Sequence, residues 1–224
     1  MKDENFNNEI DFAFDNLPYS NLYQFHKTTN SITKKMSLKS FVPTVVILIT
    51  IITCYYARLY NFGNFNELID TVPRSIMSPF LHTDQEHLSQ NVIAYALLSI
   101  PIICILPWII QPATFILCSI TGIITHNYNN PGVALEGVSA TPCGLMIVSP
   151  YGIYVFAVKS NPQCKSLYTI LFILCCLIVL VVILYFYLKP DLENDYISDA
   201  AHLGGVIGGV IVSLTFHCLN HPFL

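Results

Sequence analysis

Residues 166–188 read SLYTILFILCCLIVLVVILYFYL and contain no charged residue, no glycine and no proline. A bilayer core about 30 Å thick takes roughly 20 apolar residues of helix to cross, so this stretch is long enough to span a membrane. The whole chain agrees, since 54% of its 224 residues are hydrophobic and 11% are charged, against about a quarter charged in soluble domains. The sequence therefore predicts an integral membrane protein.

Outward from this stretch, the chain contains further apolar runs with few or no charges. With residues 166–188 they make six predicted spans, the others being Phe41–Ala57, Leu88–Trp108, Pro112–Thr125, Val138–Val158 and Ile197–Leu219. An even number of spans puts both termini on one side. Cations gather before the first span and between the fourth and fifth, at Lys34, Lys35, Lys39, Lys159 and Lys165. The positive-inside rule then places both termini in the cytoplasm.

We therefore expect an all-α membrane protein, a six-helix bundle formed by residues 41–219. Residues 1–40 are predicted to be a polar cytoplasmic tail without a cleavable signal peptide, and residues 220–224 a short C-terminal tail. The loop at 61–86 mixes apolar and polar residues, which predicts a position in the membrane interface. The net charge of −4 and the lack of a basic stripe argue against a nucleic-acid partner. Eight cysteines without a Cys-x-x-Cys pair predict neither a disulfide framework nor a metal site.

Among the polar residues inside or at the edge of these predicted spans, four form a pattern. His87 and Asn91 begin the second span one helical turn apart, Ser139 begins the fourth, and His202 lies about one to two turns into the sixth. Such residues cost a few kcal/mol in a bilayer, so they are candidates for function. Because even-numbered spans all run from the outer to the inner side, we expect these four side chains to converge near the outer surface.

A serine beside a histidine is the smallest set of groups for acyl transfer, with serine as nucleophile and imidazole as general base. No carboxylate is expected at that depth to act as a third catalytic group, so Ser139 and His202 are interpreted as a dyad. The main-chain N–H of Ser139 and the side chains of His87 and Asn91 could stabilise the oxyanion. Each signal alone is weak, because one Gly-x-Ser triplet is expected by chance and a single histidine in a span is more often a packing residue.

Three segments together resemble the rhomboid intramembrane proteases, in the family's order on spans two, four and six. They are Phe80-Leu81-His82 through His87-Leu88-Ser89-Gln90-Asn91, Gly137-Val138-Ser139-Ala140, and Ala201-His202-Leu203-Gly204-Gly205-Val206-Ile207-Gly208. The resemblance implies a Ser139–His202 dyad and oxyanion binding by His87 and Asn91. It also implies single-span transmembrane proteins as substrates, cut in or near the membrane lipid without a cofactor. No particular membrane or oligomeric state is predicted.

Two residues depart from the family pattern. Ala140 replaces the motif's second glycine and adds a methyl where helices are expected to pack closely, and Arg74 in the first loop has no tryptophan beside it. The glycines at 204, 205, 208 and 209 predict tight packing of the sixth span against a neighbour. The fifth span has no such small residues, so we expect it to pack loosely and to admit substrate from the side.

Two other functions are weighed against a protease. A catalytically silent rhomboid-like protein would bind transmembrane clients for trafficking or quality control, but such relatives usually lack the serine or the histidine. A transporter or channel would need polar residues through the full depth of the bilayer, and the inner halves of these spans are almost wholly apolar. The sequence favours an intramembrane serine endopeptidase.

Overall fold

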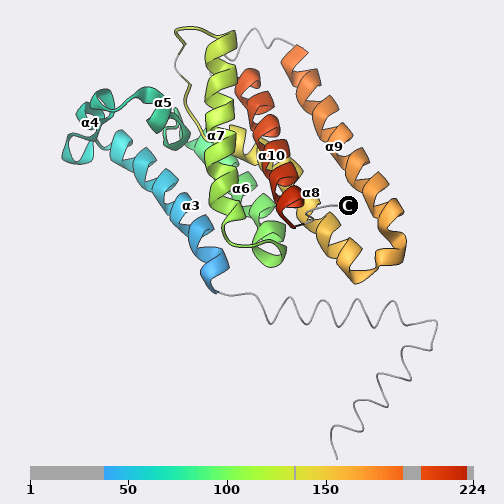
Figure 1. Ribbon diagram of the computed structural model, residues 1–224. Helices are drawn as coiled ribbons and strands as arrows, with labels where there is room; N and C mark the ends of the chain where they lie inside the picture. Colours follow the sequence, from blue (N-terminus) through green and yellow to red (C-terminus); the bar gives the residue numbers. More distant parts are fainter. Residues whose placement is uncertain (1–37, 134, 189–197, 221–224) are drawn as a thin grey trace, which may run out of the picture.

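The computed structural model describes residues 38–133, 135–188 and 198–220, and within these ranges the protein is helical with no strand (Figure 1). The long helices are α3 (Leu38–Leu59), α6 (Gln85–Ile105), α7 (Ile110–Asn129), α8 (Ala140–Ser160), α9 (Lys165–Leu188) and α10 (Asp199–Asn220). Short helices fill the loops: η1 (Phe62–Asn64), α4 (Phe65–Thr71), α5 (Arg74–Met77), η2 (Ser78–Phe80) and η3 (Pro162–Cys164). The all-α class is confirmed.

Within the described residues, each predicted span overlaps one long helix. Of these helices α3, α6, α8, α9 and α10 are long and apolar enough to cross a membrane. Helix α7 contains the predicted third span but also carries buried polar side chains, namely Gln111, Thr114, Ser119 and His126. The second span was predicted to reach Trp108, which is wrong, because α6 ends at Ile105. Leu106 is extended there, as expected of a residue that precedes a proline.

Three of the predicted regions lie wholly or largely outside the described residues. The N-terminal tail is described only from Leu38, where α3 begins, and the C-terminal tail only at Asn220. The predicted loop between the fifth and sixth spans, residues 189–196, and the first residue of the predicted sixth span, Ile197, also lie outside the described ranges.

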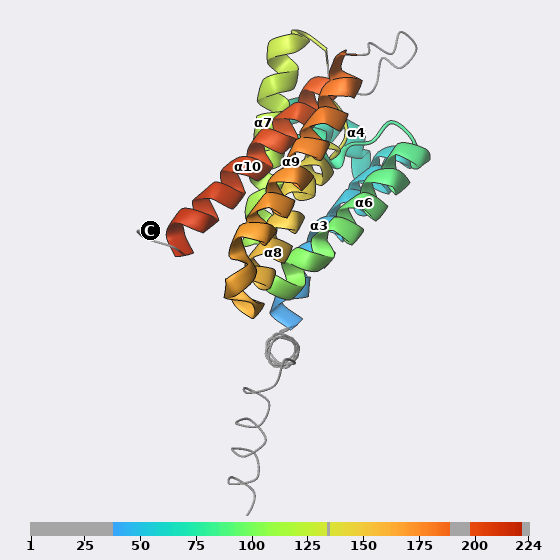
Figure 2. The ribbon, with the colours of Figure 1, turned by 90° about the vertical axis from the view of Figure 1, so that its right-hand side faces the viewer.

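Helices α7, α8 and α10 form the packed centre of the protein, with α3 on one side and α9 on the other (Figures 1 and 2). Helix α6 packs against α8 and α3. The core that joins them consists of large side chains that are almost fully buried, among them Ile51, Tyr95, Ile102, Leu145 and Val148. This arrangement brings the first turns of α6, α8 and α10 to one end of the bundle.

Helix α6 shows the sidedness of a membrane helix. Ile93 and Leu97 are more than half exposed, whereas Tyr95 and Ser99 are completely buried. Polar groups thus face the protein interior and aliphatic groups face outward, the reverse of a helix on a soluble protein. Ser99 Oγ donates to the carbonyl of Tyr95 at 2.6 Å and receives the side-chain amide of Gln111 at 2.6 Å, which satisfies it away from water.

The four glycines of α10 form two contact rows, here called the glycine seam. Gly204 and Gly208 meet α7, where an added Cβ would lie 2.7 Å from the Cα of Gly122 and 2.8 Å from the Cα of Cys118, respectively. Gly205 and Gly209 meet backbone carbonyls of α8. The prediction of tight packing is confirmed, but the seam serves two neighbours rather than one. Only glycine allows a single helix to approach two others so closely.

The first loop forms short helices on the outside of the bundle. It buries Ile69, Ser78 and Leu81 while leaving Phe62, Leu68 and Ile76 exposed. Exposed apolar groups on short amphipathic helices suit a membrane interface. The interfacial position of this loop stays a prediction.

Candidate active site

Ser139 is the N-cap of α8, as its predicted position at the start of the fourth span required. Its side chain is half-buried, and the preceding Gly137 has φ +113°, a conformation that strongly favours glycine. The N–H of Gly137 donates to the carbonyl of Ser78 at 2.9 Å, which attaches this segment to the first loop. Pro142 falls in the first turn of α8, where its missing N–H leaves no intrahelical bond unmade.

His202 lies in the first turn of α10, because the helix begins at Asp199. It is therefore nearer the end of the bundle than the one to two turns predicted. One turn further along, Gly205 contacts the carbonyl of Ala140, the residue that follows Ser139. The glycine seam thus holds the starts of α8 and α10 together. Within the described part of the chain, Ser139 and His202 are not hydrogen-bonded to one another, and such bonds are often long in free enzymes.

A carboxylate accompanies His202, contrary to the expectation of none at that depth. The Oδ1 atom of Asp199 lies 3.8 Å from Nδ1 of His202, one turn back on the same helix. That separation is too long for a hydrogen bond but close enough for electrostatic attraction. Asp199 lies in the predicted sixth span three residues before His202, and this spacing was a signal that could have identified it.

His87 lies in the first turn of α6 and contacts the segment that precedes Ser139. Its N–H donates to Oδ1 of Asp84 at 2.7 Å, which caps α6 and lowers the pKa of the Asp84 carboxyl below its ordinary value. The His87 ring packs on Gly137, where an added Cβ would lie 2.7 Å from its Cε1 atom. The structure therefore brings together the parts of the site that come from α6, α8 and α10.

Asn91 belongs to the same cluster through a residue that was not predicted as part of the site. Its side-chain amide donates to Nε2 of His82 at 3.2 Å, and the His82 and His87 rings lie edge to face at 5.2 Å. Burial, and then the neighbouring His87, lowers the pKa of His82 to about 4. His82 is therefore neutral and accepts from Asn91. Its place in the Phe80-Leu81-His82 segment was a signal that could have found it.

The methyl of Ala140 is accommodated by a glycine on the facing helix. Ala140 is 5% exposed, and a Cβ added at Gly122 of α7 would lie 2.6 Å from the Cβ of Ala140. Gly122 thus leaves the space that Ala140 fills. The departure from the family motif is matched by a small residue on α7, so the backbone contact between α8 and α10 is retained.

The C-terminal end of α7 also fixes the start of α10. Nδ1 of His126 lies 2.6 Å from the hydroxyl of Ser198, and that hydroxyl accepts the N–H of Ala201 at 3.2 Å. Thr125 adds a hydrogen bond to the carbonyl of Ala200 at 2.7 Å. These bonds hold the turn that presents His202. Among the described residues, no group of three or more His, Cys, Asp or Glu side chains could hold a metal ion.

Comparison with known proteins assigns most of the described helices to one family. A family model described as "Rhomboid domain" matches residues 70–218, which are 149 of the 224 residues and include every candidate site residue. Neither the search of curated proteins nor the search of solved structures gave a match.

Proposed function

The chain belongs to the rhomboid family and is an integral membrane protein, and we propose that it is an intramembrane serine endopeptidase with Ser139 and His202 as its catalytic dyad. One observation carries the proposal. The starts of α8 and α10 are in backbone contact at Ala140 and Gly205, while the His87 ring packs on Gly137 beside them. A nucleophile, a base and a polar ring from three helices thus gather at one end of an apolar bundle.

The proposed reaction follows from these positions. His202 takes the hydroxyl proton of Ser139 while the serine oxygen attacks the scissile carbonyl, and the imidazolium then protonates the departing amine. The peptide C–N bond breaks and an ester to Ser139 forms. Water, deprotonated by His202, then hydrolyses the ester and releases the serine. Because Nδ1 of His202 faces Asp199, Nε2 is the nitrogen assigned to these proton transfers.

The developing oxyanion would be stabilised by donors from two helices. The N–H of Ser139 lies at the positive end of α8, and His87 and Asn91 supply side chains from α6. One N–H of the Asn91 amide is bonded to His82, which orients the amide, and the second N–H can donate to the oxyanion. Loss of one such donor commonly lowers kcat by about 100-fold to 1,000-fold.

The proposed substrates are membrane proteins with a single transmembrane helix, entering past α9. None of the apolar window of α9 is buried within the protein, in keeping with a helix that can move aside in lipid. The scissile bond must leave its helix to reach Ser139, so substrates with small or helix-breaking residues there should be cut best. We place six helices in the membrane, with both termini cytoplasmic and the site near the outer face.

Cleavage by purified protein tests this function. Wild type, Ser139→Ala and His202→Ala would be reconstituted in liposomes with a single-span substrate, and the products would be identified by mass spectrometry. The proposal expects cleavage by wild type and loss of it in both variants, with unchanged thermal unfolding. A well-folded wild type that binds the substrate and leaves a panel of such substrates intact would instead favour a silent client-binding protein.

A further inference from the structure

The segment that leads into Ser139 has few attachments of its own. It leaves α7 at Asn130, and its described residues, 130–133 and 135–139, belong to no helix or strand. Gly132 and Val133 are exposed, and the carbonyl of Val133 lies 3.0 Å from Nε2 of His126. Near the nucleophile, the backbone of Gly137 is bonded to Ser78. Since Gly137 also carries the contact with the His87 ring, its position determines the shape of the proposed oxyanion site.

Another attachment is an ion pair from the end of α3, next to the first loop. Nη1 of Arg58 lies 2.7 Å from Oε2 of Glu136, the residue immediately before Gly137. The Glu136 side chain is 19% exposed and that of Arg58 35% exposed, so the pair is partly shielded from water. A contact of this length is a charge-assisted hydrogen bond, stronger and more directional than a neutral one.

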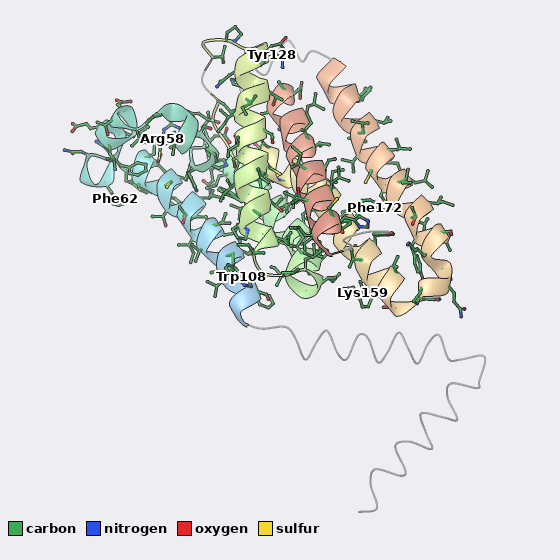
Figure 3. All side chains as sticks on the ribbon, viewed as in Figure 1. Arg58, Phe62, Trp108, Tyr128, Lys159 and Phe172 are labelled. Atoms are coloured by element: carbon green, nitrogen blue, oxygen red, sulfur yellow. The ribbon has the colours of Figure 1, made fainter. Side chains whose placement is uncertain are left out.

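Arg58 is well placed to act as the fixed partner. It lies in the last turn of α3, where the helix dipole favours a cation, and α3 is held in the bundle by the buried side chains of Ile51 and Tyr55. Figure 3 shows Arg58 beside the first-loop helices, at the end of the molecule away from Trp108 and Lys159. The ion pair therefore restrains Glu136 and its segment more than it restrains α3.

We infer that Arg58 is a positioning residue for catalysis, holding through Glu136 the Gly137-Val138-Ser139 segment in register with His87. The inference rests on the proposed protease function. Glu136 adjoins Gly137, so a shift of its backbone is transmitted directly to the His87 contact and to the N–H of Ser139. Substrate binding along α9 would not change. Misplacement of reacting groups by about 1 Å can cost about 100-fold in rate.

Charge-neutral and charge-reversed variants test the inference in liposomes. Arg58→Gln and Glu136→Gln should each lower kcat by about 10-fold or more with little change in KM. The double variant Arg58→Glu/Glu136→Arg should recover kcat to within about 3-fold of wild type. Glu67→Gln in α4 and Lys159→Gln at the far end are the matched controls, both at exposed positions, and both should keep wild-type kcat. Single variants with wild-type kcat would overturn the inference.

Amide hydrogen exchange gives a readout that does not depend on activity. In Arg58→Gln, exchange of the Gly137 amide should rise about 10-fold, while amides in the middle of α3 exchange as in wild type. Unchanged exchange at Gly137 would overturn the inference, as would faster exchange combined with wild-type kcat. A wild type that cleaves nothing would count against the proposed function alone, and the exchange rates would still decide whether Arg58 holds this segment.

Discussion

Helices α9 and α10 are of similar length and both are apolar, yet they pack in opposite ways. In α10, 39% of the apolar window is buried, whereas none of it is buried in α9, although α9 has the higher mean hydropathy of 2.6 against 1.6. The glycine seam brings α10 into backbone contact with α7 and α8. Between α9 and the pair α8 and α10 lies an apolar groove of about 490 Å³. Hydrophobicity directs a helix into lipid, but small residues decide how tightly it packs there.

The largest expected effect comes from a substitution in the glycine seam of the tightly packed helix α10. Gly205→Val would place side-chain atoms against the Ala140 carbonyl and separate the starts of α8 and α10. We expect a loss of about 3 kcal/mol or more in stability and a fall in cleavage rate of at least about 100-fold. Thermal unfolding and the liposome cleavage assay measure both.

The matching change on α9 is Ile178→Ala, at a side chain that is 63% exposed. It should cost less than about 1 kcal/mol, because no close packing is lost. Equal destabilisation by the two variants would remove the contrast between α9 and α10.

The next effect concerns the protonation of His82 and the dependence of stability on pH. The pKa of His82 is about 4, against an ordinary 6.5, so between these values the unfolded chain binds the proton more readily. Its contribution to stability is complete above pH 6.5 and is lost as the pH falls toward 4, by roughly 3 kcal/mol in all. His82→Gln should therefore unfold with a weaker pH dependence over this window. Thermal unfolding in detergent at several pH values measures it, and an unchanged dependence would contradict a buried neutral His82.

A smaller effect tests whether Gly122 accommodates Ala140. Gly122→Ala alone would bring two methyl groups to 2.6 Å and should cost about 1 to 3 kcal/mol. Adding Ala140→Gly should restore most of that loss, and Ala140→Gly alone should cost about 1 kcal/mol for the small cavity it leaves. The unfolding free energies of the four proteins form a double-mutant cycle. Additive effects would show that the two residues do not share this space.

The smallest expected effect comes from removing a ring contact between α9 and α8. The rings of Tyr154 and Phe172 stack with centroids 5.4 Å apart and connect α9 to α8. If α9 moves aside to admit substrate, Phe172→Ala should raise kcat/KM by about 2-fold to 5-fold, since such a ring pair is worth about 1 kcal/mol. Leu171→Ala, at an exposed neighbour without a ring contact, is the control. A lower kcat/KM in Phe172→Ala would argue that α9 must stay docked for cleavage.

Much of this fold could be predicted because the length and apolar composition of a segment identify a membrane-spanning helix. The positions of Ser139, His87 and Asn91 at helix starts followed from where each apolar run begins. Helix boundaries were less certain: α6 ends at Ile105 because of Pro107, and α10 starts at Asp199, which puts His202 in the first turn.

Contacts between distant segments could not be derived from one sequence. The seam's two partners, the Gly122 that faces Ala140, and the Arg58–Glu136 ion pair all depend on which helix faces lie together. Asp199 and His82 are present in the sequence, but the structure is needed to show that Asp199 lies near His202 and that His82 contacts Asn91.

The most direct test of the central claim is covalent labelling of Ser139. Wild type and His202→Ala, reconstituted in liposomes, would be treated with a fluorophosphonate probe, and the peptide containing Ser139 would be analysed by mass spectrometry. We expect an adduct on Ser139 in wild type and its loss in His202→Ala, because the hydroxyl needs the base to react. Folded wild type without an adduct, or equal labelling in both proteins, would contradict the Ser139–His202 dyad.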